Sequence, residues 1–438
     1  MATLREEALQ AFRAGRDEEA LALLSEVVRR TPSDHRARMF GAQCLARLGE
    51  TERALSVLST TAENLARRDY LLSATLAAKL GLALRSDDAR LLGVLRRIHA
   101  RAAASTKRAA VPPPLPPEPP GRVSADELCA HLRGQDLLEK AYEILGGADD
   151  GALAVAGVRP PLPLFAFVDP EAFLELVRRM GLREVTHGEA IVTEGEKGES
   201  IFVIVAGRAR VERLVRGERK LLATLPGGSL FGELALLTGG VRHATVIAEG
   251  EAELFEISGG DLEAVARRFP EVPHAIAQFA EKRVASNMLV TAGLFDNLPP
   301  EKRSAVLEKF RPRTVPPGER MVVEEEPAPG LFLVMAGEMS VTKRDPGGET
   351  VSLNLLKDGD VFGEISLLSG GVASATVTAV RRSVVAILPR EEFPALVAGN
   401  PAVGDYLRQL SEGRLQATAD SMRPAEVIDA EELVVTGE

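Results

Sequence analysis

Hydrophobic residues recur every three or four positions along the first hundred residues of the chain. Leu4, Ala8, Leu9 and Phe12 begin this pattern, which is the spacing of one buried helix face. The pattern therefore predicts helices throughout residues 1–104.

Small residues and glycines repeat within this region at a fixed distance of 34 positions. Gly15, Ala20 and Leu24 return as Gly49, Ala54 and Leu58. The period and the segments GRDEEAL and GETERAL resemble the tetratricopeptide repeat, in which glycine makes the turn and alanine lets paired helices approach. The resemblance implies a concave face that binds a protein partner. A plain helical bundle without a ligand is the alternative.

A proline-rich stretch, VPPPLPPEPP at Val111–Pro120, follows the helices and predicts an extended spacer, because proline fixes φ and removes backbone donors. After it, SADE at Ser124–Glu127 predicts the start of a helix that runs to about Gly146. The apolar stripe of this helix predicts packing on a neighbouring domain or on another protomer. The stripe consists of Leu128, Leu132, Leu138, Ala141 and Leu145.

From about residue 158, short β-like runs bounded by glycine replace the helical pattern, and the whole block occurs twice. The run IFVIVAG at 201–207 returns as LFLVMAG at 331–337, and one extra residue enters the second copy at the hairpin Arg344–Glu349. Many short strands with regular turn signals predict a β-roll in each copy.

The predicted fold is thus α+β and multidomain, a tetratricopeptide-like helical repeat followed by two tandem jelly-roll-like domains with flanking helices. The predicted divisions are a helical domain at 1–104, a linker at 105–123, a helical segment and linker at 124–157, rolls at 158–288 and 289–419, and an acidic disordered tail at 420–438.

The duplicated block contains a repeated loop, FGELALLTGGVRHATV at 231–246, which returns as FGEISLLSGGVASATV at 362–377 with 11 of 16 positions identical. Its glycines permit close backbone approach, and ELALL predicts a short helix whose first amides can face an anion. Glu233 can accept a hydrogen bond from a ribose hydroxyl or complement the helix dipole, and Arg242 carries a planar fork suited to phosphate oxygens. Together these groups predict a cyclic nucleotide as the ligand.

The same loop resembles the phosphate-binding cassette of cyclic-nucleotide-binding domains, such as those of cyclic-AMP-dependent protein kinase regulatory subunits and the catabolite activator protein. The resemblance extends from about residue 158 to 415. It implies that Glu233 holds the ribose 2′-hydroxyl and Arg242 the exocyclic phosphate. It also implies backbone contacts from Gly232, Leu234, Ala235 and His243. His243 stands where this family commonly has alanine, serine or threonine, at a position that helps to choose between cAMP and cGMP. Histidine leaves that choice open, and cAMP is the favoured ligand of the two.

The second copy departs from this pattern. Gly363 and Glu364 remain as doubtful ligand residues, but Ala373 stands in place of the arginine. Losing a charge-assisted partner of a buried phosphate typically costs about 2–5 kcal/mol. Arg381 and Arg382 are expected on the next turn, where they do not replace the missing cation. We therefore expect the second copy to be a structural domain.

Composition and charge narrow the class of protein. The net charge of −10 and pI of about 5.4 argue against a broad nucleic-acid surface. Cys44 and Cys129 fit no metal or disulfide spacing and suit a reducing cytoplasm. No run approaches the roughly 18 apolar residues that a membrane span needs. Six scattered histidines without a metal spacing or nucleophile motif disfavour an enzyme, and the acidic end of the chain leaves no basic recognition helix for a transcription factor.

These observations predict a non-catalytic, cyclic-nucleotide-responsive regulatory or adaptor protein without a prosthetic group. Its ligand is cAMP or cGMP in the first roll, and its helical repeats bind an unidentified protein. The alternative is a nucleotide-independent scaffold built from degenerate domains of the same fold. Homo-oligomerisation through the charged helices near the linker stays open.

Overall fold

The computed structural model describes residues 3–104, 129, 131–147, 168–215, 217–238, 240–277, 280, 288, 292–296 and 298–421. By its internal contacts the chain forms two compact units. The first comprises residues 1–236 and 244–279, and the second comprises residues 237–243 and 280–438.

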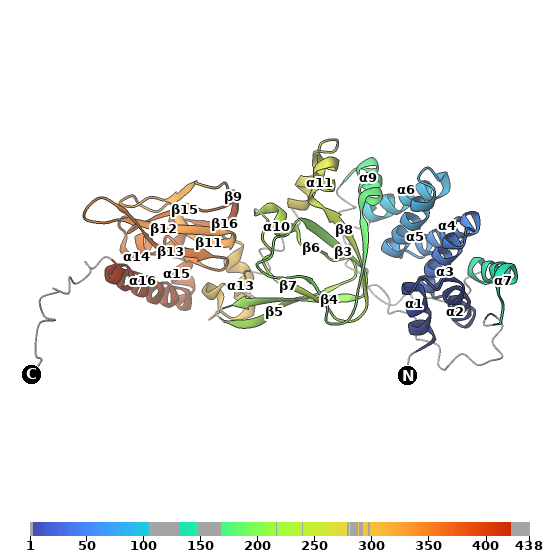
Figure 1. The fold of residues 1–438 in the computed structure, drawn as a ribbon. Helices are drawn as coiled ribbons and strands as arrows, with labels where there is room; N and C mark the ends of the chain where they lie inside the picture. The colour runs from blue at the N-terminus through green and yellow to red at the C-terminus, as the bar shows by residue number, and fades with distance from the viewer. Residues whose placement is uncertain are drawn as a thin grey trace, which may run out of the picture. The chain divides into compact units, whose positions relative to one another are not determined.

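A helical region of consecutive, mutually packed helices opens the first unit (Figure 1). The turn glycines predicted from the 34-residue period are confirmed, because Gly15 and Gly49 have φ of 71° and 91°, where glycine is favoured. Ala20 and Ala54 are fully buried, as close helix packing requires. The helices are α1 (Leu4–Arg13), α2 (Asp17–Arg30), α3 (His35–Arg47), α4 (Thr51–Arg67), α5 (Leu71–Leu84) and α6 (Ala89–Ala104).

A further helix, α7 (Gly134–Gly146), packs on α2, α3 and α4 of the helical region. It begins later than the sequence predicts, because His131–Arg133 are not helical and Gly134 has a φ of 54°. The SADE segment and the proline-rich spacer lie outside the described residues. The buried stripe of α7 faces the helical region of the same chain, which is the neighbouring-domain alternative, and consists of Leu137, Ala141 and Leu145.

The first roll consists of two four-stranded antiparallel sheets, with strand orders β1-β8-β3-β6 and β2-β7-β4-β5. Alternating apolar residues of both sheets, such as Ile204, Val246 and Leu254, fill its interior. The strands are β1 (Gly181–Val185), β2 (Ala190–Val192), β3 (Ser200–Ala206), β4 (Arg208–Val215), β5 (Glu218–Pro226), β6 (Leu230–Phe231), β7 (Thr245–Ala248) and β8 (Ala252–Ser258). The helices of the roll are α9 (Pro170–Arg179), α10 (Glu233–Leu237) and α11 (Gly259–Ala266).

The helical region and the first roll share one continuous hydrophobic core. Helices α5 and α6 pack on α9, and α5 also contacts β3. Polar contacts reinforce this packing: Lys79 Nζ donates to the Val177 carbonyl at 3.0 Å, and His99 Nε2 lies 2.7 Å from the Val168 carbonyl. The helical region therefore uses part of its surface to pack against the roll of its own chain.

The second roll repeats the architecture of the first within the second unit, with strand orders β14-β11-β16-β9 and β10-β15-β12-β13. The predicted extra residue does fall in the hairpin between β12 and β13. Its strands are β9 (Arg311–Val315), β10 (Arg320–Val322), β11 (Gly330–Ala336), β12 (Glu338–Arg344), β13 (Thr350–Lys357), β14 (Val361–Phe362), β15 (Thr376–Ala379) and β16 (Ser383–Pro389). The accompanying helices are η1 (Gly293–Phe295), α13 (Pro300–Leu307), α14 (Glu364–Ser369), η2 (Arg390–Glu392), α15 (Phe393–Gly399) and α16 (Pro401–Ser421).

Helix α16 corrects the predicted start of the acidic tail, because Asp420 and Ser421 are still helical. The remainder of that tail lies outside the described residues.

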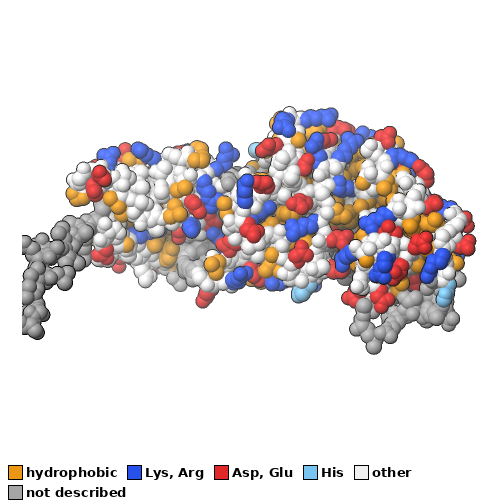
Figure 2. Space-filling view, viewed as in Figure 1, with side chains coloured by type: hydrophobic (Ala, Val, Ile, Leu, Met, Phe, Trp, Pro, Cys, Tyr) orange, Lys and Arg blue, Asp and Glu red, His pale blue; other side chains and the backbone are white. Residues whose placement is uncertain are grey.

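The surface carries charges of both signs. Figure 2 shows basic and acidic side chains interspersed on the face in view, without a continuous basic stripe there. Within the described ranges, no helix has both the length and the hydropathy of a membrane span. Cys44 and Cys129 are buried and unpaired with each other, and burial raises the pKa of the Cys44 thiol to about 12.

Candidate functional site

The two cassettes, defined as residues 231–246 and 362–377, begin with the same backbone geometry. Gly232 has a φ of 88° and Gly363 a φ of 87°, and each precedes the first residue of a short helix, α10 or α14. A side chain at Gly363 would place a Cβ 2.6 Å from the Gly330 carbonyl oxygen. The positive φ favours glycine in both cassettes, and at Gly363 the lack of space for a side chain adds a second reason.

Glu233 and Ala235 of the first cassette are both 1% exposed, and Leu234 is half-buried. All three belong to the first compact unit. Burying a carboxylate this deeply costs free energy unless hydrogen-bond donors reach it. A ribose hydroxyl is such a donor, so Glu233 is suited to binding one.

Arg242 and His243 belong to the second compact unit. Arg242 is 7% exposed, so its guanidinium is largely withdrawn from solvent. Both ring nitrogens of His243 have partners in that unit: Nε2 lies 2.7 Å from Thr238 Oγ1, and Nδ1 lies 2.6 Å from Asp358 Oδ2. The assembly of Glu233 and Arg242 into one ligand site stays a prediction.

The second cassette borders a cavity of about 360 Å³ within the second roll. Glu364, 1% exposed, lines this cavity, and its Oε1 accepts a hydrogen bond from Arg414 Nη1 at 3.0 Å. The same Arg414 nitrogen donates to the Val361 carbonyl at 2.6 Å. A cation therefore reaches the cassette carboxylate from α16, fifty residues further along the chain.

Ala373 occupies the position that corresponds to Arg242, and it is 6% exposed. Its N–H donates to the Glu326 carbonyl at 2.8 Å, and its own carbonyl accepts from the Glu325 N–H at 3.0 Å. Glu325 has a φ of 67°, whereas the first roll has a glycine at the equivalent position, Gly195, with a φ of 85°. The second cassette thus keeps the backbone contacts between Ala373 and the Glu325–Glu326 segment, but it has no arginine at this position. Arg381, as expected, lies on the turn before β16 and pairs with Glu338 at 3.4 Å.

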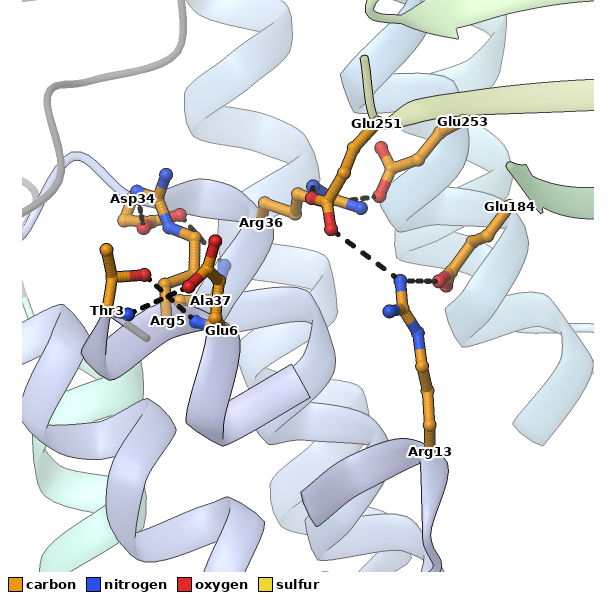
Figure 3. A network of polar contacts seen from close by, with 10 residues as sticks. All are labelled: Thr3, Arg5, Glu6, Arg13, Asp34, Arg36, Ala37, Glu184, Glu251 and Glu253. Atoms are coloured by element: carbon orange, nitrogen blue, oxygen red, sulfur yellow. Dashed lines mark hydrogen bonds and ion pairs between the residues drawn. The ribbon is translucent and has the colours of Figure 1, made fainter. Parts of the chain in front are cut away.

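An ion-pair cluster joins the helical region to the first roll, and sequence reasoning missed it (Figure 3). Arg36 of α3 donates to Glu253 on β8 at 2.7 Å and to Glu251 at 2.8 Å. Arg13, at the end of α1, lies 3.3 Å from Glu184 on β1. The one available signal was the charged residue Glu253 in a strand whose second copy carries Val384 at that position.

Burial governs the electrostatics of this cluster. Desolvation raises the pKa of the Glu253 carboxyl, although the Arg36 guanidinium acts in the opposite direction. The pKa of Arg36 is also raised, because Glu253 and Glu251 outweigh the effect of burial. The pair therefore has a cationic partner that stays charged and a carboxylate whose ionisation is costly.

Comparison with known sequences supports the assignment of the two rolls. Residues 182–269 and 312–400 match the family described as "Cyclic nucleotide-binding domain". The chain therefore carries two cyclic nucleotide-binding domains in tandem, and domains of this kind are non-catalytic in themselves.

Its relatives include kinase regulatory proteins. A cAMP-dependent protein kinase regulatory subunit from Yarrowia lipolytica is 28% identical over 56% of this chain and 61% of its own length. The cGMP-dependent protein kinase 2 of Rattus norvegicus is 30% identical over 56% of this chain and 30% of its own length. The solved catabolite activator protein of Thermus thermophilus is 33% identical over 29% of this chain and 60% of its own, with a TM-score of 0.28. The chain thus spans less than two thirds of these relatives.

Proposed function

We propose that the protein is a non-catalytic regulatory or adaptor protein that binds cAMP or cGMP in its first roll. Glu233 accepts a hydrogen bond from the ribose 2′-hydroxyl, and Arg242 binds the exocyclic phosphate. The backbone of Gly232, Leu234, Ala235 and His243 completes the contacts. The ligand is regulatory, and no prosthetic group takes part.

The observation that carries this proposal is the difference between the cassettes in a chain whose rolls both belong to the cyclic nucleotide-binding family. The first cassette has a deeply buried carboxylate, Glu233, and a largely buried guanidinium, Arg242. A guanidinium binds phosphate oxygens in a bidentate manner, and such a charge-assisted contact is stronger when water is excluded. The names of the curated relatives, which are cAMP- and cGMP-dependent kinases and their regulatory subunits, agree with this ligand class.

The response to ligand passes through the packing of the first unit. Helix α11 follows β8 directly, and its Asp261 Oδ1 lies 3.3 Å from Arg179 Nη1 of α9. Helix α9 in turn packs on α5 and α6. A shift of α11 on ligand binding therefore changes how α9 packs on α5 and α6 of the helical region. The surface of the helical region that does not contact the roll binds a protein partner.

Calorimetric titration of the full chain with cAMP and cGMP tests the proposal. We expect saturable binding, and an Arg242→Ala variant that binds roughly 30- to several-thousand-fold more weakly, because the phosphate loses its charged partner. Arg219→Ala, which removes an exposed arginine of β5, is the matched control and should bind as the parent does. Absence of binding by the parent, or equal binding by Arg242→Ala, would favour the nucleotide-independent scaffold.

A further inference from the structure

The second roll contains a cavity suited to a small molecule, although its cassette has lost the arginine. The volume of about 360 Å³ lies in the roughly 300–1,000 Å³ range of small-molecule pockets. Val322, Leu356 and Phe362 contribute to an apolar wall, and Ala417 and Thr418 of α16 line another side. A cavity with apolar walls and few polar groups favours a ligand with a flat apolar portion.

Two charged side chains line this cavity, Glu364 and Arg414, and they are paired with each other. The Glu364 side chain is 2% exposed and that of Arg414 is 24% exposed. Because one charge compensates the other, the cavity presents no net charge to a ligand. A phosphate in it would be a buried anion without a counterion of its own, which is strongly unfavourable.

The position that corresponds to Arg242 of the first cassette carries no cation in the second. Ala373 is buried, and its backbone is hydrogen-bonded on both sides to the Glu325–Glu326 segment. Arg390, another cation near α14, donates to the Ala328 carbonyl at 3.0 Å and to Ser366 Oγ at 3.2 Å. Its guanidinium is therefore held by the protein.

The carboxylate has been retained where the guanidinium has been lost. Glu364 follows Gly363 with the same geometry as Glu233 after Gly232. A buried carboxylate accepts hydrogen bonds from hydroxyl groups, and these charge-assisted bonds are stronger than neutral ones. Two ligand contacts are expected in the first roll, one to a sugar hydroxyl and one to a phosphate. The second roll can provide only the contact to the sugar hydroxyl.

We propose that the second roll binds an uncharged nucleoside in this cavity. The apolar walls hold the base, and the Glu364 carboxylate accepts a hydrogen bond from a sugar hydroxyl. Arg414 donates a hydrogen bond to Glu364 and so ties α16 to the cassette beside the ligand. This site is separate from the cyclic nucleotide site proposed in the first roll, and either can exist without the other.

Titration of the full chain with adenosine and guanosine tests this site. We expect saturable binding of at least one of them, and a Glu364→Gln variant that binds it roughly 10- to 100-fold more weakly. The matched change in the first roll, Glu233→Gln, should weaken cyclic nucleotide binding and leave nucleoside binding unchanged. Ala417→Trp, at an exposed helix position that lines the cavity, should abolish nucleoside binding by filling the space.

Three results would overturn the proposal. The first is no saturable binding of either nucleoside in the millimolar range. The second is nucleoside binding that persists in both Glu364→Gln and Ala417→Trp, or that is lost in Glu233→Gln. The third is displacement of bound nucleoside from Glu233→Gln by cAMP at equal affinity, because the cavity would then accept a phosphate. Each result leaves the Arg242-dependent test of the first roll unaffected.

Discussion

The cassettes of the two rolls have the same backbone conformation at their first glycine and carry different side chains. Gly232 and Gly363 have nearly equal φ, and the glutamates that follow them are each 1% exposed. The arginine is present in one cassette and replaced by a buried alanine in the other. The backbone geometry of the loop is therefore the same with and without the arginine, and the two copies differ in side-chain chemistry rather than in fold.

A second difference concerns the sheet that contains β8 in the first roll and β16 in the second. On β8 the buried Glu253 pairs with Arg36 of the helical region, whereas the corresponding residue of β16 is the buried Val384. The register is equivalent, because Glu253 is opposite Ala206 of β3 and Val384 is opposite Ala336 of β11. The first roll thus carries a docking residue for the helices that the second roll lacks.

The largest effect is expected from breaking this docking contact. Arg36→Ala leaves Glu253 buried without its cation, which typically costs about 3–5 kcal/mol of unfolding free energy. Urea denaturation followed by circular dichroism measures the loss. Arg13→Ala is the control, because its side chain is 44% exposed and such ion pairs contribute about 1 kcal/mol or less.

The second roll suggests how that loss is rescued. A double variant, Arg36→Met with Glu253→Val, replaces the buried pair by apolar groups and copies the valine of β16. We expect it to recover most of the stability lost in Arg36→Ala. Equal stability of Arg36→Ala and the parent would show that the contact does not hold the helical region.

The left-handed glycine at the start of the cassette predicts that a substitution in the second roll also lowers stability. Gly363→Ala should cost about 2–4 kcal/mol, from the left-handed conformation and from a Cβ placed 2.6 Å from the Gly330 oxygen. Gly371→Ala is the matched control in the same cassette, because its Cβ would meet nothing closer than Ser369 Oγ at 3.4 Å. Thermal unfolding of both variants tests the prediction, and equal melting temperatures would contradict it.

Placing an arginine at position 373 should allow the second cassette to bind a cyclic nucleotide more tightly. In an Arg242→Ala background, Ala373→Arg is expected to raise cAMP or cGMP affinity roughly 10- to 100-fold through a new charged hydrogen bond. Ala373→Met adds comparable bulk without charge and is the control in the same background. If both variants bind alike, the alanine is not what excludes a phosphate from the second roll.

The sequence predicted most of the fold because its signals are local or repeated. The 34-residue period located the turn glycines, and the duplication located both rolls and the extra hairpin residue. The candidate site residues could be proposed from a motif, because the cassette lies within one continuous stretch of chain, and their contacts with a ligand stay a prediction. The predicted start of α7 at the capping box is wrong, because the helix begins only at Gly134, which takes a positive φ.

Contacts between distant segments could not be predicted in this way. Arg36 meets Glu253 across 217 residues, and Arg414 meets Glu364 across 50 residues. Neither pair has a periodic pattern or a spacing that links its members. Arg381 and Arg382, the arginines that follow the cassette in the sequence, were expected not to replace the missing cation, and the cation that reaches Glu364 is Arg414 of α16.

The smallest effect is a pH dependence that belongs to the first roll. Burial raises the pKa of Glu253, while Arg36 lowers it and the nearby Glu184 and Glu251 add to the increase. A carboxyl whose pKa is higher in the folded chain than in the unfolded chain binds its proton more tightly when folded. Its stabilising contribution is complete below the unfolded pKa of about 4.3 and is lost as the pH rises through the folded value.

The parent should therefore lose stability relative to Glu253→Gln over that window, with a slope of at most about 1.4 kcal/mol per pH unit. Urea midpoints measured from acidic to neutral pH test this difference. A parent that instead gains stability over Glu253→Gln as the pH rises would show that Arg36 outweighs burial. The docking contact would then be a net favourable ion pair.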